Sequence, residues 1–262
     1  MQISFSVFTK PWHAPLEELA DHVKSLGFDG VELPVRPSYP VTPENVEVEL
    51  PKAAEVFRQR GLTIASVAGP TDEATFAACA QAGIPIVRIC VAVGDEGYLA
   101  SEAALQHEFE GLVPLLDRYG VTLGVQNHSG RSVCNAQGLR MLLKPFERKH
   151  VAAVWDAAHN ALNGEEPELA LDLVWDHLCM VNLKSAYWRR TTGPESDDVV
   201  WQPYWTTGRQ GLASWPRVAA ELRRRRYSGV VCLTAEYTDE FSVDRLIAED
   251  LAYAKGLLSQ VG

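Results

Sequence analysis

Four polar side chains occupy similar places in the sequence, each closing a short apolar run that predicts a β-strand. They are Gln126 in LGVQN, Asp156 in AAVWD, Asn182 in MVNLK and Glu236 in CLTAE. In a barrel of parallel strands these strand ends meet in one mouth, which is where such barrels carry their chemistry. Carboxylate and amide oxygens suit hard divalent ions such as Mg²⁺ or Mn²⁺. The four residues therefore predict a divalent-metal site, with only two charged ligands.

The two amides leave a second interpretation open, in which the set is a former metal site. A polar side chain at a strand end often caps the backbone of the following loop, and this role suits Gln126 and Asn182. Asp156 and Glu236 point more strongly to function, because buried carboxylates are rare unless they are paired or bind a ligand.

Further polar residues accompany the same strand ends. Lys184 lies two residues beyond Asn182, hence on the same side of the strand, and its ammonium could stabilise an alkoxide or an enediolate. His159 follows Asp156 by three residues and could hydrogen-bond a substrate hydroxyl or orient Asp156. Glu32 ends a predicted strand and could accept from a sugar hydroxyl or pair with Lys184. We expect Glu236 to act as the base, with Lys184 and His159 at the oxyanion and Glu32 and His128 at the substrate.

Strand-like and helix-like segments alternate along the whole chain. The near-continuous apolar runs are typical of parallel strands buried on both faces. Glycines such as Gly27 and Gly120 stand where a left-handed cap would end a helix. The expected strands are 2–8, 29–33, 62–68, 85–93, 121–127, 151–156, 179–185 and 229–236. The expected helices are 16–26, 43–60, 72–82, 101–119, 136–143, 167–177, 214–226 and 242–258. This alternation predicts a single (β/α)8 barrel domain over residues 1–262.

The longest segment without a predicted element is 186–211. It carries several aromatic residues and arginines, including Trp188 and Arg209, and its aromatic content argues against disorder. Loops of this length are usually functional. We expect a lid that brings Trp188 and Arg209 to the substrate, with a contact in a homo-oligomer as the alternative.

Composition excludes several classes of partner. A net charge of −10 over 262 residues disfavours broad electrostatic binding of nucleic acid. No apolar run approaches the roughly 18 residues of a membrane-spanning helix. Five cysteines without a CxxC pair, and a start without the features of a signal peptide, fit a reduced, cytoplasmic protein.

With these motifs the sequence resembles the xylose isomerase-like TIM-barrel superfamily of sugar isomerases and epimerases. The resemblance rests on LGFDGVEL, QNHSG, WDAAH, VNLKS and YSGVVCLTAEY and covers nearly the whole chain. In that family a Glu, an Asp, a His and a Glu bind one divalent ion, and the two glutamates move protons on either face of a substrate carbon. Asp156 and Glu236 match this pattern, whereas Gln126 and Asn182 replace the first glutamate and the histidine. The replacements imply a weakly held ion, Mg²⁺ or Mn²⁺ rather than Zn²⁺, or none.

Two functions follow as expectations. The first is an isomerase, epimerase or related lyase that acts on a small polyhydroxy carbonyl compound by metal-assisted proton transfer. The second is a metal-free barrel that binds a sugar or polyol and has lost catalysis, which the Gln126 and Asn182 replacements favour because a neutral amide cannot serve as a general base.

Overall fold

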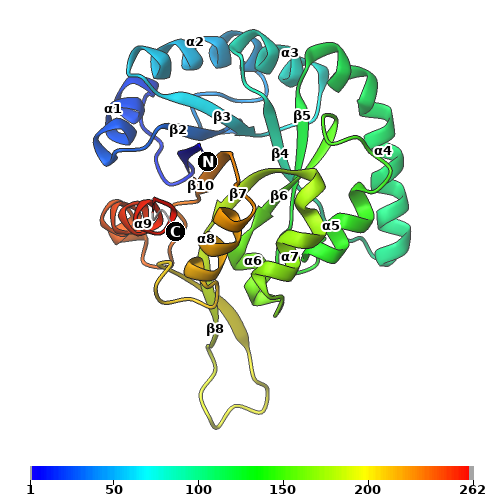
Figure 1. The fold of residues 1–262 in the computed structure, drawn as a ribbon, viewed down its shortest axis with the longest axis vertical. Helices are drawn as coiled ribbons and strands as arrows, with labels where there is room; N and C mark the ends of the chain where they lie inside the picture. Colours follow the sequence, from blue (N-terminus) through cyan, green and yellow to red (C-terminus); the bar gives the residue numbers. More distant parts are fainter. Residues whose placement is uncertain (1, 260–262) are drawn as a thin grey trace.

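Eight parallel strands form a closed barrel in the computed structural model, which describes residues 2–259 (Figure 1). Going around the barrel, each barrel strand pairs with the barrel strand that follows it in the sequence, and the last pairs with the first. The barrel strands are β1 (Ile3–Phe8), β2 (Gly30–Pro34), β3 (Thr63–Ala68), β4 (Ile86–Cys90), β5 (Thr122–Gln126), β6 (Val151–Asp156), β7 (Leu178–Leu183) and β10 (Gly229–Leu233). The predicted (β/α)8 barrel is therefore confirmed.

Helices surround the barrel and follow the strands in the expected order (Figure 1). They are α1 (Leu16–Leu26), α2 (Val46–Gln59), α3 (Glu73–Ala82), α4 (Tyr98–Tyr119), α5 (Ala136–Leu143), α7 (Pro167–Val174), α8 (Trp215–Arg224) and α9 (Val243–Leu258). Gly27 and Gly120 end their helices at φ 88° and 63°, in the left-handed region where a Cβ is penalised. A short additional helix, α6 (Ala157–Leu162), follows β6 directly and was not predicted.

Successive side chains along a barrel strand point alternately toward the helices and toward the barrel axis, so the strands contribute to two separate parts of the apolar core. The side chains that face the helices form the larger part, with the fully buried Trp155 among them. The side chains that face the axis form a small cluster with one residue from each of six strands: Phe8, Ala68, Ile86, Val154, Met180 and Cys232. This inner layer fills the barrel, so polar side chains at the strand ends lie on a packed floor.

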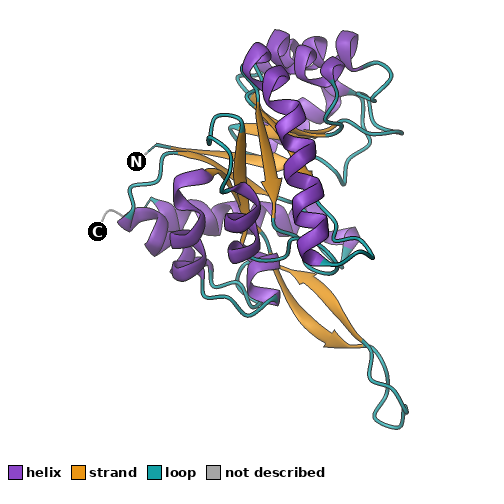
Figure 2. Ribbon diagram, turned by 90° about the vertical axis from the view of Figure 1, so that its right-hand side faces the viewer, coloured by secondary structure: helices purple, strands orange, loops and turns teal. Residues whose placement is uncertain are grey.

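The segment 186–211 is largely an antiparallel hairpin and not an irregular loop. It contains β8 (Ser185–Arg190) and β9 (Trp201–Thr206), and it projects from the body of the molecule (Figure 2). Aromatic side chains favour the extended conformation, and the cross-strand pair Tyr187 and Tyr204 stacks with ring centroids 5.1 Å apart. The prediction missed these strands because they belong to a separate sheet and lack the apolar runs of the barrel strands. Among the described helices, none has the length and apolar character required to cross a bilayer.

Candidate functional site

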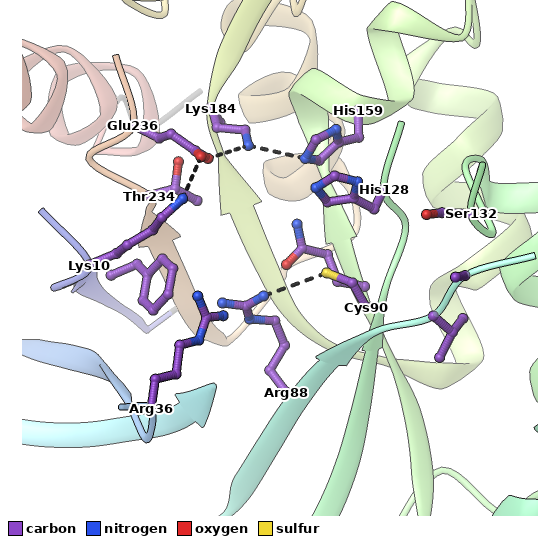
Figure 3. A pocket seen from close by; sticks show the side chains of 14 residues that line it. Lys10, Arg36, Arg88, Cys90, His128, Ser132, His159, Lys184, Thr234 and Glu236 are labelled. Atoms are coloured by element: carbon purple, nitrogen blue, oxygen red, sulfur yellow. Dashed lines mark hydrogen bonds and ion pairs between the residues drawn. The ribbon is translucent and has the colours of Figure 1, made fainter. Parts of the chain in front are cut away.

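A cavity of about 360 Å³ opens at the mouth of the barrel, where the predicted residues meet (Figure 3). Its lining includes Gln126, His128, His159, Lys184 and Glu236, all singled out from the sequence. The lining also carries the cations of Lys10, Arg36 and Arg88, and Glu236 is its sole carboxylate among the described residues.

Lys184 stands at the centre of the site. It follows β7 directly and is buried, and its Nζ lies 2.8 Å from Glu236 Oε2 and 3.0 Å from His159 Nε2 (Figure 3). Lys10, two residues after the end of β1, approaches the same carboxylate, with Nζ 2.9 Å from Oε1. Burial opposes the charge of Glu236, but the two ammonium groups outweigh it and lower the pKa of the carboxyl to about 2. Each oxygen of Glu236 is thus held by one cation.

His159 is placed by the short helix that the sequence analysis missed. Asp156 ends β6 and caps α6, because its Oδ1 accepts from the backbone N–H groups of Ala158 and His159 at 2.9 and 3.0 Å. The capped turn aims the His159 ring into the cavity, where desolvation and the neighbouring Lys184 hold its pKa well below 6.5. The imidazole is therefore neutral at pH 7.

The neutral ring of His159 can hold its proton at either nitrogen. With the proton on Nδ1, the hydroxyl of Ser129 accepts it at 2.9 Å while Lys184 donates to Nε2. With the proton on Nε2, the backbone N–H of Ser129 donates to Nδ1 at 3.0 Å, but the ring N–H then faces the Lys184 ammonium, which cannot accept it, so Lys184 must move away. A neutral imidazole accepts at only one nitrogen, so the two arrangements exclude each other. This ring is suited to deliver a proton to the cavity or to take one from it.

Gln126, Asp156 and Asn182 form a chain of hydrogen bonds on the cavity floor. Gln126 Nε2 donates to Asp156 Oδ2 at 3.0 Å, and Asn182 Nδ2 donates to Gln126 Oε1 at 3.2 Å. All three side chains are buried, and desolvation raises the pKa of Asp156. Asn182 Oδ1 is left without a hydrogen-bond partner. The amides therefore bind one another and the aspartate through side-chain hydrogen bonds, and neither caps the backbone of a following loop as the alternative interpretation had expected.

The predicted metal set of Gln126, Asp156, Asn182 and Glu236 does not fit a divalent ion in this arrangement. Asp156 and Glu236 are its only charged members, and no group of three or more His, Cys, Asp or Glu side chains that could hold an ion occurs within residues 2–259. Both oxygens of Glu236 lie within 2.9 Å of an ammonium nitrogen. An ion bound to either oxygen at about 2.1 Å would sit within about 5 Å of a positive charge, which costs about 7 kcal/mol at an effective dielectric constant of 20. Two lysine ammonium groups thus hold the carboxylate that the predicted set assigns to the ion.

Glu32 does not pair with Lys184, as the sequence had suggested it could. Its carboxylate is fully buried and binds the Arg88 guanidinium in a fork, at 2.8 and 2.9 Å, with Ser66 Oγ donating at 3.0 Å. Burial works against the charge of Arg88, but Glu32 more than offsets it and raises the pKa of the guanidinium. Glu32 therefore lies beneath the cavity, outside its lining, and holds in place the Arg88 side chain that lines it.

Of the remaining predicted substrate residues, His128 lies in the cavity and the other two do not. His128 lines the cavity, and its ring lies 4.1 Å from that of His159. Trp188 is 42% exposed on the hairpin and donates to the carbonyl of Leu162 at 3.0 Å. The Arg209 guanidinium lies over the Tyr253 ring at 3.8 Å. Neither residue lines the cavity, because Trp188 lies on the projecting hairpin and Arg209, which follows β9, packs against Tyr253 of α9.

Four residues that the sequence analysis missed contribute to the site: Lys10, Arg36, Arg88 and Trp205. Arg88 interrupts the apolar run PIVRICVAV, and a charge in such a run is a signal that could have found it. Trp205 comes from the base of the hairpin, with its ring 3.9 Å from Lys184 Nζ and edge-on to His159. No local signal marks Trp205, because its position depends on the hairpin.

Comparison with known proteins agrees with this architecture. Three structural neighbours have TM-scores of 0.74, 0.72 and 0.72: 3-keto-D-glucoside 4-epimerase YcjR from E. coli, D-psicose 3-epimerase from Clostridium cellulolyticum H10 with D-tagatose, and the probable 3-DHS dehydratase AsbF from Bacillus anthracis. Their identities to this chain are 14%, 12% and 10%, and the matches cover 97%, 98% and 96% of it and 100%, 100% and 98% of theirs. Likeness at such low identity concerns the fold. No curated protein sequence matches.

The family comparison covers most of the sequence. A model of the xylose isomerase-like TIM barrel matches residues 20–257, which contain seven of the eight barrel strands and every residue of the cavity except Phe8 and Lys10. The chain therefore belongs to the xylose isomerase-like TIM barrel family.

Proposed function

We propose that this protein is an isomerase or epimerase that moves a proton at a carbon next to the carbonyl of a small polyhydroxy compound. One observation carries the proposal: the Lys184 ammonium lies between the Glu236 carboxylate and the neutral His159 ring, inside the cavity at the barrel mouth. A volume of about 360 Å³ lies at the small end of the range for ligand pockets and suits a small sugar. The epimerases among the structural neighbours support the same class of reaction.

Glu236 is the proposed base, and Lys184 the group that stabilises the enediolate. A carboxylate with a pKa of about 2 is too weak to take a proton from carbon while both cations hold it. A substrate carbonyl oxygen that draws Lys184 toward itself weakens the ion pair and raises the pKa of Glu236. The same movement places the ammonium where negative charge develops on oxygen. Binding of the substrate thus activates the base and prepares the electrophile together.

Inversion at carbon needs a second group on the opposite face. His159 is neutral, lines the cavity and has a proton that can occupy either ring nitrogen. His128 lies beside it and is the alternative donor. Trp205 covers Lys184 and limits the access of water to the developing charge.

Exchange of a substrate C–H proton with solvent deuterium tests the proposal. The protein is incubated in D₂O with a panel of ketoses and of sugar acids, and deuterium incorporation is followed by NMR. Glu236→Gln removes the base while keeping the shape of the side chain, and we expect it to slow exchange by at least 100-fold. Glu108→Gln on the exposed face of α4 is the matched control and should exchange like the unaltered protein. Equal rates in the two variants would rule out Glu236 as the base.

A second candidate is a barrel that binds its ligand without turnover. The observation that favours it is the complete pairing of Glu236, whose two oxygens are both held by lysines. In this case a sugar or polyol raises the melting temperature while no exchange occurs on any member of the panel. Exchange abolished by Glu236→Gln decides against it.

A further inference from the structure

The cavity lining carries an excess of positive charge. Lys10, Arg36, Arg88 and Lys184 line the cavity, with Glu236 as the one lining carboxylate in the described part of the chain. Adding the buried Asp156 and Glu32 beneath the floor still leaves four cations against three carboxylates. The whole chain has a net charge of −10, so the cavity differs in sign from the rest of the molecule. Cations gathered inside a recess focus a field that attracts anions.

Arg36 is the cation of this group that has no counter-ion. Lys10 and Lys184 bind Glu236, and Arg88 binds Glu32. Within residues 2–259, the Arg36 side chain makes no hydrogen bond or ion pair with another side chain. Its guanidinium carbon lies 5.6 Å from the centroid of the Phe8 ring, and that of Arg88 lies 4.8 Å from the same centroid. Both side chains line the cavity, and Figure 3 draws them at the end away from Lys184 and Glu236.

The position of Arg36 is fixed by its backbone. It follows β2 in a turn, where its N–H donates to the carbonyl of Val41 at 3.2 Å and its carbonyl accepts from the N–H of Tyr39. A second cavity of about 370 Å³ shares Arg36, Arg88 and Cys90 with the first. Both arginines therefore line open space that a ligand group can enter. Both guanidinium groups are positively charged, so an anion in this part of the cavity is attracted by both.

We infer that Arg36, together with Arg88, binds an anionic group of the substrate, a carboxylate or a phosphate. Guanidinium groups match both anions with paired hydrogen bonds. The inference rests on the proposed function and narrows it, because the substrate becomes a sugar acid or a sugar phosphate and not a neutral ketose. The anionic end lies against the arginines, and the reacting carbon lies against Lys184 and Glu236 across the same cavity. Arg36 is a binding residue and takes no part in proton transfer.

Direct binding measurements test this inference without turnover. Calorimetric titration with inorganic phosphate and with D-gluconate probes the two anions, and D-glucose serves as the neutral counterpart of gluconate. We expect Arg36→Gln to weaken the binding of the preferred anion at least tenfold, and Arg36→Lys to weaken it less. The control is Arg245→Gln on α9, which removes an arginine that is exposed and paired with Glu249. It should bind like the unaltered protein. Added salt should weaken anion binding, since charge attraction is screened.

The outcomes separate the inference from the proposed function. Anion binding that depends on Arg36, without deuterium exchange on any compound, supports the anion site and refutes the isomerase. Exchange on neutral ketoses at a rate that Arg36→Gln leaves unchanged supports the isomerase and overturns the anion site. Preference for gluconate identifies a carboxylate substrate, and preference for phosphate identifies a phosphorylated one. Equal binding of glucose and gluconate, in the unaltered protein and in Arg36→Gln, also overturns it.

Discussion

Removal of the Glu32 charge should destabilise the barrel far more than removal of an ordinary surface charge. Glu32 is fully buried and Arg88 is 6% exposed, with two short hydrogen bonds between them. At about 4 Å between charge centres and an effective dielectric constant of 20, the pair attracts by about 4 kcal/mol. Glu32→Gln leaves the guanidinium buried without a counter-charge. We therefore expect the free energy of unfolding to fall by about 3–5 kcal/mol.

The assay is equilibrium unfolding in urea, which does not screen charges, followed by circular dichroism. Glu73→Gln is the matched control, because the Glu73–Arg118 pair has the same 2.8 Å separation but is 55% and 60% exposed. The Glu73→Gln substitution should lower the free energy of unfolding by less than about 1 kcal/mol. The double variant Glu32→Leu, Arg88→Met removes both charges, and its free energy of unfolding should lie within about 2 kcal/mol of that of the unaltered protein. A loss below about 1 kcal/mol for Glu32→Gln would refute the view that Glu32 holds Arg88 beneath the cavity.

Three further predictions concern pH, metal and the hairpin. Burial raises the pKa of the Asp250 carboxyl from 3.8 to about 6, so the native state binds a proton there more tightly than the unfolded state does. The free energy of unfolding should therefore fall by about 3 kcal/mol as the pH rises from 4 to 6. The Asp250→Asn variant should lack this part of the pH profile. Addition of 1 mM Mg²⁺ or Mn²⁺ should shift the melting temperature by less than about 1 °C, because the donor set does not fit an ion; a rise of several degrees would show that it does. Replacing residues 191–200 by Asn-Gly should leave ligand affinity unchanged, since Arg190 pairs with Trp201 and Trp205 stays in place; a loss of affinity would restore the lid hypothesis.

Much of the barrel is predictable because its strands are buried on both faces. Runs such as VAAVWD and TIASVA allow little besides a buried parallel strand, and the glycines that follow several helices mark the turns. Helix α6 escaped prediction because AAHNAL is six residues long and its start depends on the Asp156 cap. The hairpin escaped because its strands pair only with each other.

The candidate site divides in the same way. The strand-end positions of Asp156, Lys184 and His159 follow from the order of strands, so their convergence was predictable. The ion-pair partners of Glu32 and Glu236 were not predictable. Glu32 and Arg88 lie on β2 and β4, 56 residues apart and separated by β3, and their contact exists only once the barrel closes. For the same reason the sequence could not show that Lys10 and Lys184 hold Glu236.

Proton exchange in metal-free protein tests the central claim most directly. The claim is that Lys184 supplies the positive charge for which the family pattern uses an ion. Protein is dialysed against EDTA, its metal content is checked by elemental analysis, and deuterium incorporation is measured on the panel with and without added Mn²⁺. We predict exchange in the stripped protein that Mn²⁺ leaves unchanged and that Lys184→Met reduces at least 100-fold. Exchange that appears only when Mn²⁺ is added, or that survives Lys184→Met, would contradict the claim.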